Sequence, residues 1–325
     1  MIRDAQADDK RKSFMLDMRG SHIVVPMSLV SWKTYVEVCR LGSFSAAAVE
    51  LGFTQSAVSR QIATLERSVG VQLLARGPRG IEPTAAGEAF GHHARVVVNE
   101  IERAKQAALD TDSTGGGSLA IGAVPSVAAG VLPAAIHSLG THLLRAWTLM
   151  PGLTPELEAK VASAELDLAI VTDAPPGVST DHRLHRTPVG VDEMRVIVPL
   201  DHPLAGAGRQ PLRAFANERW VEDNVGSAAL LRRQAARAGF EPAIDLVAFD
   251  LLGKMAMVAA GHGLALIPAT FSPSLRRDVV SIPLVDSPER GIYAITAATT
   301  DATTPMISAL IDAVRAAITD THSPS

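Results

Sequence analysis

Hydrophobic residues between positions 43 and 79 recur at the spacing of short amphipathic helices. One helical stripe follows spacings of four, three and four residues, and consists of Val58, Ile62, Leu65 and Val69. The opposite side carries small or polar side chains, namely Ser56, Arg60, Ala63 and Arg67. The pattern predicts a helix with one buried face and one polar face.

A shorter helix is predicted just before this one, from Ser45 to Leu51. It is rich in alanine, and small side chains let two helices approach closely. Gly52 supplies a C-terminal stop, and the Thr54 hydroxyl is placed to cap the second helix. The segment is therefore predicted to be a helix, a short turn and a second helix.

The polar start of the second helix has the character of a DNA recognition helix. Such a helix reaches base edges and phosphates with its first turns, where this sequence places Gln55, Ser56, Ser59 and Arg60. The alternative is an ordinary helical bundle, which also has one apolar and one polar face. The Gly/Pro-rich segment that follows, with Arg76 and Arg79, favours the DNA interpretation, because such a wing can lie on the DNA backbone or in the minor groove.

A much longer helix is predicted from Thr84 to about Leu109. Its apolar seam alternates spacings of four and three residues, and consists of Phe90, Ala94, Val97, Ile101, Ala104 and Ala108. A helix of about 25 residues extends beyond one small domain. We therefore expect the seam to pair two copies of the chain; the alternative is that it packs on its own winged domain.

The rest of the chain alternates between strand and helix patterns. Strands are predicted at 118–124, 146–150, 167–171, 194–199, 220–222, 244–249, 264–267 and 291–297, and helices at 127–139, 154–165, 227–238, 251–260 and 306–318. This order predicts an α/β region of parallel sheets covered by helices.

Composition and charge fit a globular protein of two or three compact units. The chain has 325 residues, of which 47% are hydrophobic and 20% charged, so it is not a disordered protein. Its net charge is −4, so DNA affinity would depend on where the arginines lie and on pairing of two chains. Residues 1–26 are expected to be a flexible extension, too poor in apolar residues for a signal peptide or membrane span, and translation could start at Met15, Met18 or Met27.

The cysteine and histidine residues predict neither a disulfide nor a metal site. Cys39 is the single cysteine, which excludes a disulfide within the chain and is typical of a reducing cytoplasm. We expect it in a helical core with Trp32, Tyr35 and Val36, a redox switch being the alternative. His92–His93 point in different directions on a helix, and His182 and His185 have metal-like spacing without other ligands nearby, so no metal site is predicted.

Several runs of residues are together similar to the winged helix-turn-helix of LysR-type transcriptional regulators. These runs are 41–48 (LGSFSAAA), 54–59 (TQSAVS), 70–76 (GVQLLAR) and 83–87 (PTAAG). The resemblance extends over nearly the whole chain from about Leu29. The family usually carries Phe and Leu where this chain has Leu74 and Pro83, which affects local packing and not DNA binding.

The resemblance implies a domain organisation and a DNA-contacting set. The expected order is a winged helix-turn-helix at 27–86, a linker and dimerisation helix at 87–112, a Gly-rich hinge at 113–117, an effector-binding domain at 118–318 and a tail at 319–325. That domain resembles periplasmic binding proteins, with subdomain I at about 118–188 and 286–318, subdomain II at about 189–285, and hinges near 188–191 and 282–286. The expected DNA contacts are Ser43, Thr54, Gln55, Ser56, Ser59, Arg60, Arg76 and Arg79.

An effector is expected in the cleft between the two subdomains. Ser126 and Ser227 each open a predicted helix, and a hydroxyl beside free N–H groups suits an anion. The alternative is that both serines are ordinary helix caps. The candidate effector-binding residues are Ser126, Thr172, Asp173, Val225, Gly226, Ser227 and Phe249. Few long cationic side chains are expected beside these turns, which favours a mono- or dicarboxylate or an aromatic acid over a polyphosphate.

The sequence thus predicts a cytoplasmic, homo-oligomeric bacterial transcription factor. Its expected partners are double-stranded promoter DNA, a small-molecule effector, a second copy in a dimer or tetramer, and RNA polymerase as a further candidate. No cofactor is expected, and no nucleophile elbow, zinc-protease motif or P-loop indicates an enzyme. The rival hypothesis is a stand-alone ligand-binding or catalytic α/β protein with a repurposed helix-turn-helix.

Overall fold

The computed structural model describes residues 28–78, 80–111, 117–140, 144–175, 177–223, 226–298 and 305–322. The predicted extension at 1–26, the candidate residues Arg79 and Val225, most of the glycine-rich hinge and the last three residues of the tail lie outside this set. The chain forms two compact units, which divide between Val98 and Asn99.

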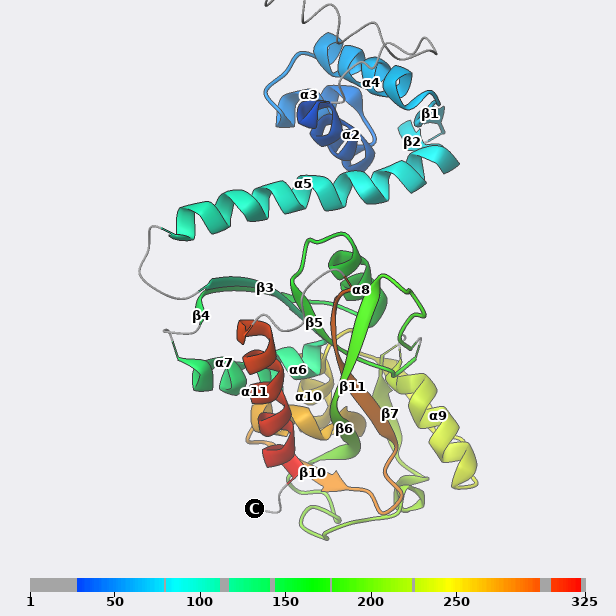
Figure 1. Cartoon of the computed structure of the whole chain (residues 1–325). Coiled ribbons are helices and arrows are strands. Elements are labelled where there is room, and N and C mark those ends of the chain that lie inside the picture. Colours follow the sequence, from blue (N-terminus) through cyan, green and yellow to red (C-terminus); the bar gives the residue numbers. More distant parts are fainter. Residues whose placement is uncertain are drawn as a thin grey trace, which may run out of the picture. The chain divides into compact units, whose positions relative to one another are not determined.

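Among its described residues, the first unit contains the start of the long helix α5 (Ala85–Thr111) together with three shorter helices and a hairpin (Figure 1). The shorter helices and the strands of the hairpin are α2 (Leu29–Leu41), α3 (Phe44–Glu50), α4 (Gln55–Val69), β1 (Leu74–Gly77) and β2 (Gly80–Pro83). Side-chain oxygens of Ser28, Ser43 and Thr54 cap the three helices by accepting a backbone N–H of the first turn. The predicted helix-turn-helix and its threonine cap are confirmed, and α3 begins one residue early because Ser43 caps it.

The stripe predicted on α4 is the core-facing one. Val58, Ile62 and Leu65 are buried, and Val69 packs against the same cluster with α2 and α3. Glu66 accepts the N–H groups of Leu73 (2.8 Å) and Leu74 (3.1 Å) and so fixes the hairpin to the end of α4. Cys39 packs at the edge of this core, as expected.

The first turn of α5 (Ala85–Thr111) packs tightly on the winged fold. An added Cβ at Gly87 would lie 1.9 Å from the Leu73 carbonyl oxygen, whereas one at Gly91, a turn later, would lie 3.3 Å from the Tyr35 ring. We predict that Gly87→Ala lowers the free energy of unfolding of this unit by about 1–3 kcal/mol through overpacking. Gly91→Ala is the matched control and should cost much less. Urea unfolding followed by Trp32 fluorescence measures both, and equal losses would contradict this packing.

The apolar seam on α5 has a buried part at its start and an exposed part further along the helix. The Phe90 ring packs at an angle against the rings of Trp32 and Tyr35, with centroids 5.1 and 5.2 Å apart, and Ala94 is fully buried in the same core. These two residues were expected at a dimer contact, but they are used by their own winged fold, as the alternative proposed. Val97 and Ile101 remain 37% and 38% exposed, and Ala104 is exposed.

The second unit contains a seven-stranded sheet in the order β10-β6-β11-β5-β3-β4, with β9 also paired to β6. Its strands are β3 (Gly117–Ala123), β4 (Leu144–Pro151), β5 (Leu168–Thr172), β6 (Leu184–Pro199), β9 (Ala265–Pro268), β10 (Val279–Pro283) and β11 (Glu289–Ala297). A separate pair consists of β7 (Arg219–Glu222) and β8 (Ala243–Val247). The helices are α6 (Pro125–Gly130), α7 (Leu132–Leu139), α8 (Thr154–Ala162), α9 (Ser227–Arg237), α10 (Leu251–Ala259) and α11 (Pro305–His322), with 3-10 turns η1 (Leu212–Phe215) and η2 (Ala269–Ser274).

The expectation of purely parallel sheets is wrong. β3 pairs with β4 and β5 in parallel, and β7 with β8, but β6 pairs with β9, β10 and β11 in antiparallel, as β11 does with β5. The reason is topological. The chain leaves one hydrophobic core along β6 and returns along β11, so these two crossing strands must run in opposite directions.

Three hydrophobic clusters of described residues lie along the crossing strands, and the two largest are named core I and core II. Core I includes Ile121, Leu168 and Ile295, and reaches β6 as far as Val189. Core II is built around Trp220 and Phe215 and meets β6 from Met194 onward. The 16-residue β6 was predicted only from residue 194, since Pro188 and Gly190 interrupt its first half. β10 was not predicted.

Candidate functional site

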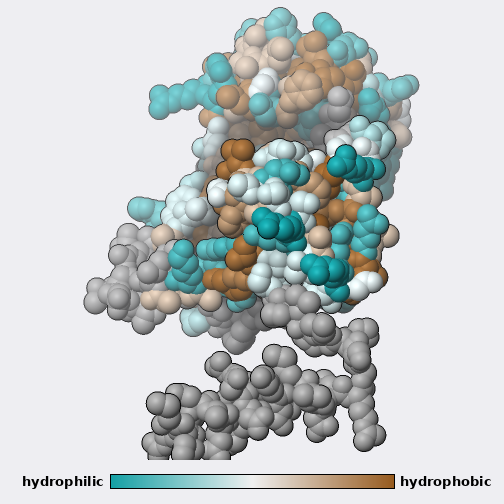
Figure 2. All heavy atoms as spheres, turned by 90° about the horizontal axis from the view of Figure 1, so that it is seen from above, coloured by the Kyte–Doolittle hydropathy of each residue, from teal (hydrophilic) through white to brown (hydrophobic). Residues whose placement is uncertain are grey.

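The start of α4 presents an exposed polar face. Gln55, Ser56, Ser59 and Arg60 are all exposed, on the side away from the buried stripe. Thr54 Oγ1 lies 3.1 Å from Ser56 Oγ, and Arg60 Nε donates to the Ser56 carbonyl at 3.2 Å. These contacts are local to the helix, so the Arg60 guanidinium is held near the helix start without being buried. Figure 2 shows hydrophilic, near-neutral and hydrophobic side chains interspersed on the face of the winged fold that it views.

The wing adds one described arginine. Arg76 lies exposed on β1, while its partner at the hairpin tip falls outside the described residues. Ser43 is half-buried and its hydroxyl accepts the Ala46 N–H at 3.3 Å. Among the expected DNA contacts, Ser43 is therefore already engaged in capping α3.

A cavity of about 200 Å³ lies between elements of core I and core II. It is lined by five of the seven predicted effector residues: Ser126, Thr172, Gly226, Ser227 and Phe249. Asp173 does not line it; its carboxylate instead accepts the Gly291 N–H at 2.8 Å and ties β5 to β11. The two walls of the cavity approach closely at Gly226. A Cβ atom added to this glycine would lie only 2.9 Å from the Pro175 carbonyl oxygen.

On the core I side of the cavity, an arginine accompanies Ser126. Arg290 Nη2 donates to Ser126 Oγ at 2.6 Å and to Asp192 Oδ2 at 2.7 Å. Asp192 is fully buried and also accepts from the hydroxyl (2.7 Å) and backbone N–H (3.0 Å) of Thr270. Arg290 and Asp192 face each other in the register of the crossing strands β11 and β6. The cavity is thus joined directly to both crossing strands.

On the core II side, a buried lysine lies among carboxylates. Lys254 Nζ contacts Glu222 Oε2 at 2.6 Å and Asp223 Oδ2 at 3.0 Å. Ser227 Oγ contacts both carboxylates and accepts from Lys254. Asp223 Oδ1 accepts the N–H groups of Gly226 (2.9 Å) and Ser227 (3.2 Å). The N–H groups at the start of α9 are therefore already bonded to a carboxylate of the protein itself, that of Asp223.

Burial and the nearby positive charge shift the pKa values of Glu222 and Asp223 in opposite directions. Burial raises the pKa of Glu222, although Lys254 and the Ser227 hydroxyl oppose that rise. Burial also favours a higher pKa for Asp223, but the Lys254 charge, the Ser227 hydroxyl and the Gly226 N–H together outweigh it and hold that pKa well below its usual range. Of the two acids, Asp223 is therefore the one whose ionised form the site favours more strongly.

The structure corrects one alternative and one expectation about the serines. Neither residue is a helix cap: Ser126 lies inside α6, whose cap position is Val124, and Ser227 follows the cap Gly226. Long cations do lie beside both turns, namely Arg290 and Lys254. Arg290 lies 164 residues from Ser126 in the sequence, and Lys254 lies 27 residues from Ser227. No local sequence pattern therefore indicates these contacts.

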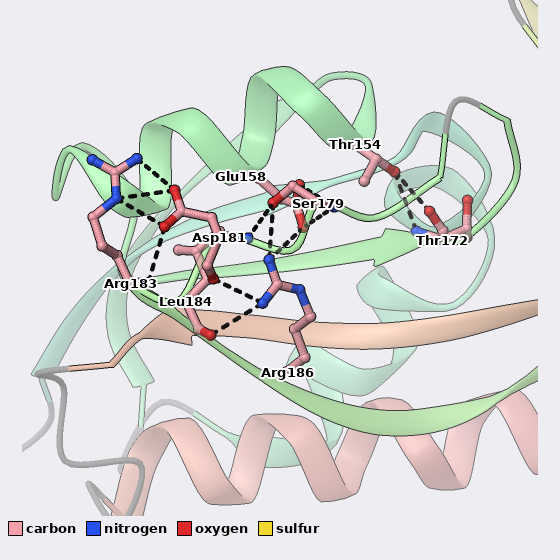
Figure 3. Close-up of polar contacts among 8 residues, drawn as sticks. All are labelled: Thr154, Glu158, Thr172, Ser179, Asp181, Arg183, Leu184 and Arg186. Carbon is pink, nitrogen blue, oxygen red and sulfur yellow. Dashed lines mark hydrogen bonds and ion pairs between the residues drawn. The ribbon is translucent and has the colours of Figure 1, made fainter.

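The core I wall of the cavity is held by a polar cluster (Figure 3). Thr154 Oγ1, at the start of α8, donates to the Thr172 carbonyl at 2.9 Å, and both residues line the cavity. One turn along α8, the buried Glu158 accepts the Ser179 N–H at 2.9 Å and contacts Arg186 at 3.4 Å. These bonds fix the segment after β5 against α8.

Comparison with known proteins identifies both units. The family model "Bacterial regulatory helix-turn-helix protein, lysR family" matches residues 29–88, and "LysR substrate binding domain" matches residues 113–319. The chain belongs to the LysR family. It is a DNA-binding transcriptional regulator with an effector-binding domain, and this family is one of regulators and not of enzymes.

Individual members of the LysR family resemble the chain over most of its length. The transcriptional dual regulator GltC of Bacillus subtilis is 30% identical over 264 residues, which is 79% of this chain and 86% of GltC. The Hca operon transcriptional activator HcaR of Escherichia coli is 30% identical over 269 residues, 79% of this chain and 87% of HcaR. The full-length structure of CbnR complexed with its target DNA shares the fold, with a TM-score of 0.65 at 20% identity, covering 89% of this chain and 99% of that one.

The described residues of this LysR-family chain include no group of three or more His, Cys, Asp or Glu side chains that could hold a metal ion. Of the two histidines with metal-like spacing, His185 lies on strand β6. None of the helices in the part of the chain that the structure describes combines the length and apolarity that crossing a membrane requires.

Proposed function

We propose that this LysR-family regulator reads its operator with the start of α4 and supports that contact with the wing. The observation that carries the proposal is the exposed set Gln55, Ser56, Ser59 and Arg60 opposite the buried stripe of the same helix. Thr54, Ser43, Arg76 and Arg79 complete the proposed interface. The arginines of the wing neutralise phosphates, and Arg60 reads a base edge.

The remaining assignments belong to the same proposal. The domain limits are 27–86, 87–112 and 118–318, and the protein acts in the cytoplasm as a dimer or tetramer, with RNA polymerase as a further partner. A small anionic effector binds in the cavity beside Ser126, Thr172, Gly226 and Phe249. Its binding would act through a differential affinity for two arrangements of the regulator.

Three arginine variants test the DNA interface. Arg60→Ala should cost about 1–3 kcal/mol of specific binding, because a base contact is lost. Arg76→Ala should weaken promoter and scrambled DNA alike, as loss of a phosphate contact does. Fluorescence anisotropy with labelled DNA at fixed salt measures both.

Arg67→Ala is the matched control for Arg60→Ala. Arg67 is also exposed on α4, and its Nε likewise donates to the carbonyl four residues earlier, at 3.1 Å, but it lies two turns further from the helix start. It should bind DNA nearly as the parent does. If Arg60→Ala and Arg67→Ala retain equal specificity, the recognition face has been assigned wrongly.

A further inference from the structure

The cavity is chemically asymmetric, and this asymmetry narrows the class of effector. On the core I side, the Arg290 side chain is 11% exposed and lines the cavity beside Ser126. Its Nε and Nη2 donate to Asp192 and Ser126, while Nη1 has no hydrogen-bond partner among the described residues. Arg290 therefore brings one positive charge to the cavity wall, together with the N–H groups of Nη1 as unused hydrogen-bond donors.

The core II side cannot offer a second anion site. The N–H groups that open α9 already bond Asp223, and Lys254 is shared between Glu222 and Asp223. Asp223 and Asp250 both line the cavity and would repel a second carboxylate. The rest of this wall is apolar and includes Leu230, Phe249 and Leu251, of which Phe249 is 91% exposed.

We propose that the effector is a small monocarboxylate with an uncharged, apolar body, and that Arg290 together with Ser126 binds its carboxylate. This inference rests on the proposed effector-binding function and specifies its ligand class. The volume of about 200 Å³ suits such a molecule, since a cavity of about 150 Å³ accepts benzene. A guanidinium and a hydroxyl supply charge-assisted and neutral donors to the two carboxylate oxygens.

The test uses the full-length chain and a panel of probes in calorimetry without DNA. Benzoate, hexanoate and cyclohexanecarboxylate represent the proposed class, benzamide is a neutral analogue, and terephthalate carries a second carboxylate. At least one monocarboxylate should bind at millimolar or lower concentration, and its amide and dicarboxylate analogues should bind about 10- to 100-fold more weakly, as expected for loss of a hydrogen bond to a charged group.

A charge-neutral pair of substitutions tests the role of Arg290 without leaving Asp192 buried and unpaired. Arg290→Gln combined with Asp192→Asn removes both charges together and should abolish the preference for acid over amide. The matched control makes the same changes in an exposed pair on α11, Arg315→Gln with Asp312→Asn, whose side chains are 45% and 71% exposed. The control should bind as the parent does.

Specific outcomes overturn the proposal. These are failure of every monocarboxylate to bind, equal or tighter binding of benzamide or terephthalate, or unchanged acid preference in the folded Arg290/Asp192 variant, with circular dichroism confirming the fold. Operator binding is measured separately by anisotropy. A defect there would count against the proposed DNA interface and would leave the calorimetric result intact.

Discussion

Replacing Lys254 with alanine is expected to lower the free energy of unfolding of the second unit by about 3–5 kcal/mol, the cost of removing one partner from a buried ion pair. Lys254 is 1% exposed and Glu222 is fully buried, so without Lys254 the Glu222 carboxylate must either stay ionised in a buried site or take up a proton, and both cost stability at neutral pH. Urea unfolding followed by the fluorescence of Trp220, which lies in core II, measures the loss.

Two controls distinguish charge from packing at Lys254. Lys254→Met with Glu222→Gln removes both charges and keeps an acceptor for the Leu266 N–H, so it should be much less destabilised than Lys254→Ala. Arg219→Ala breaks an ion pair between side chains that are 60% and 50% exposed, and should change stability by less than about 1 kcal/mol. A Lys254→Ala loss no larger than that of Arg219→Ala would contradict a buried ion pair.

The same variant should also acquire a distinctive pH dependence. Burial raises the pKa of Glu222, and replacing Lys254 removes the positive charge that opposes that rise. An acid whose pKa is higher in the folded state binds its proton more tightly there, so stability falls as pH rises from the unfolded value toward the folded one. Lys254→Ala should therefore be more stable at mildly acidic than at alkaline pH, with a steeper slope than the parent.

Aspartate at both Val97 and Ile101 is expected to dissociate the oligomer and to abolish operator binding with it. These two residues carry the part of the α5 seam that its own winged fold leaves exposed, at 37% and 38%. Buried in a contact between two copies, each new carboxylate would lack a partner, which costs several kcal/mol. Light scattering coupled to size exclusion gives the mass, and anisotropy gives the DNA affinity.

The control places the same charge on apolar residues outside α5. Val247→Asp with Val285→Asp alters two valines that are 45% and 55% exposed in the second unit. This variant should keep the mass and DNA affinity of the parent. If the Val97/Ile101 variant also keeps the parent mass, the chains pair through another surface.

Local periodicity made the winged fold predictable from sequence. The stripe on α4 and the threonine cap depend on residues within one or two helical turns, and the structure contains both. The α5 seam shows the limit of the same reasoning. Spacing identifies an apolar stripe but not its partner, so Phe90 and Ala94 were assigned to a second chain although they pack on Trp32 and Tyr35.

The cleft was predictable only in part, for a related reason. Ser126 and Ser227 follow strands and Thr172 ends one, and all three line the cavity, as this topology predicted. Arg290 and Lys254 come from distant segments, and the sequence near each serine carries no sign of them. The antiparallel crossing strands were missed for the same reason, since Pro188 and Gly190 hide the first half of β6 and pairing across the hinge is non-local.

The central claim is that this chain is a sequence-specific DNA-binding regulator, and a salt series tests it most directly. Full-length protein is titrated onto its own promoter region and onto a scrambled duplex of equal length, with anisotropy read at several salt concentrations. We expect the promoter to be bound about 1,000-fold or more tightly than the scrambled duplex, with both affinities falling as salt rises. Equal affinity for the two duplexes at every salt concentration would contradict the claim.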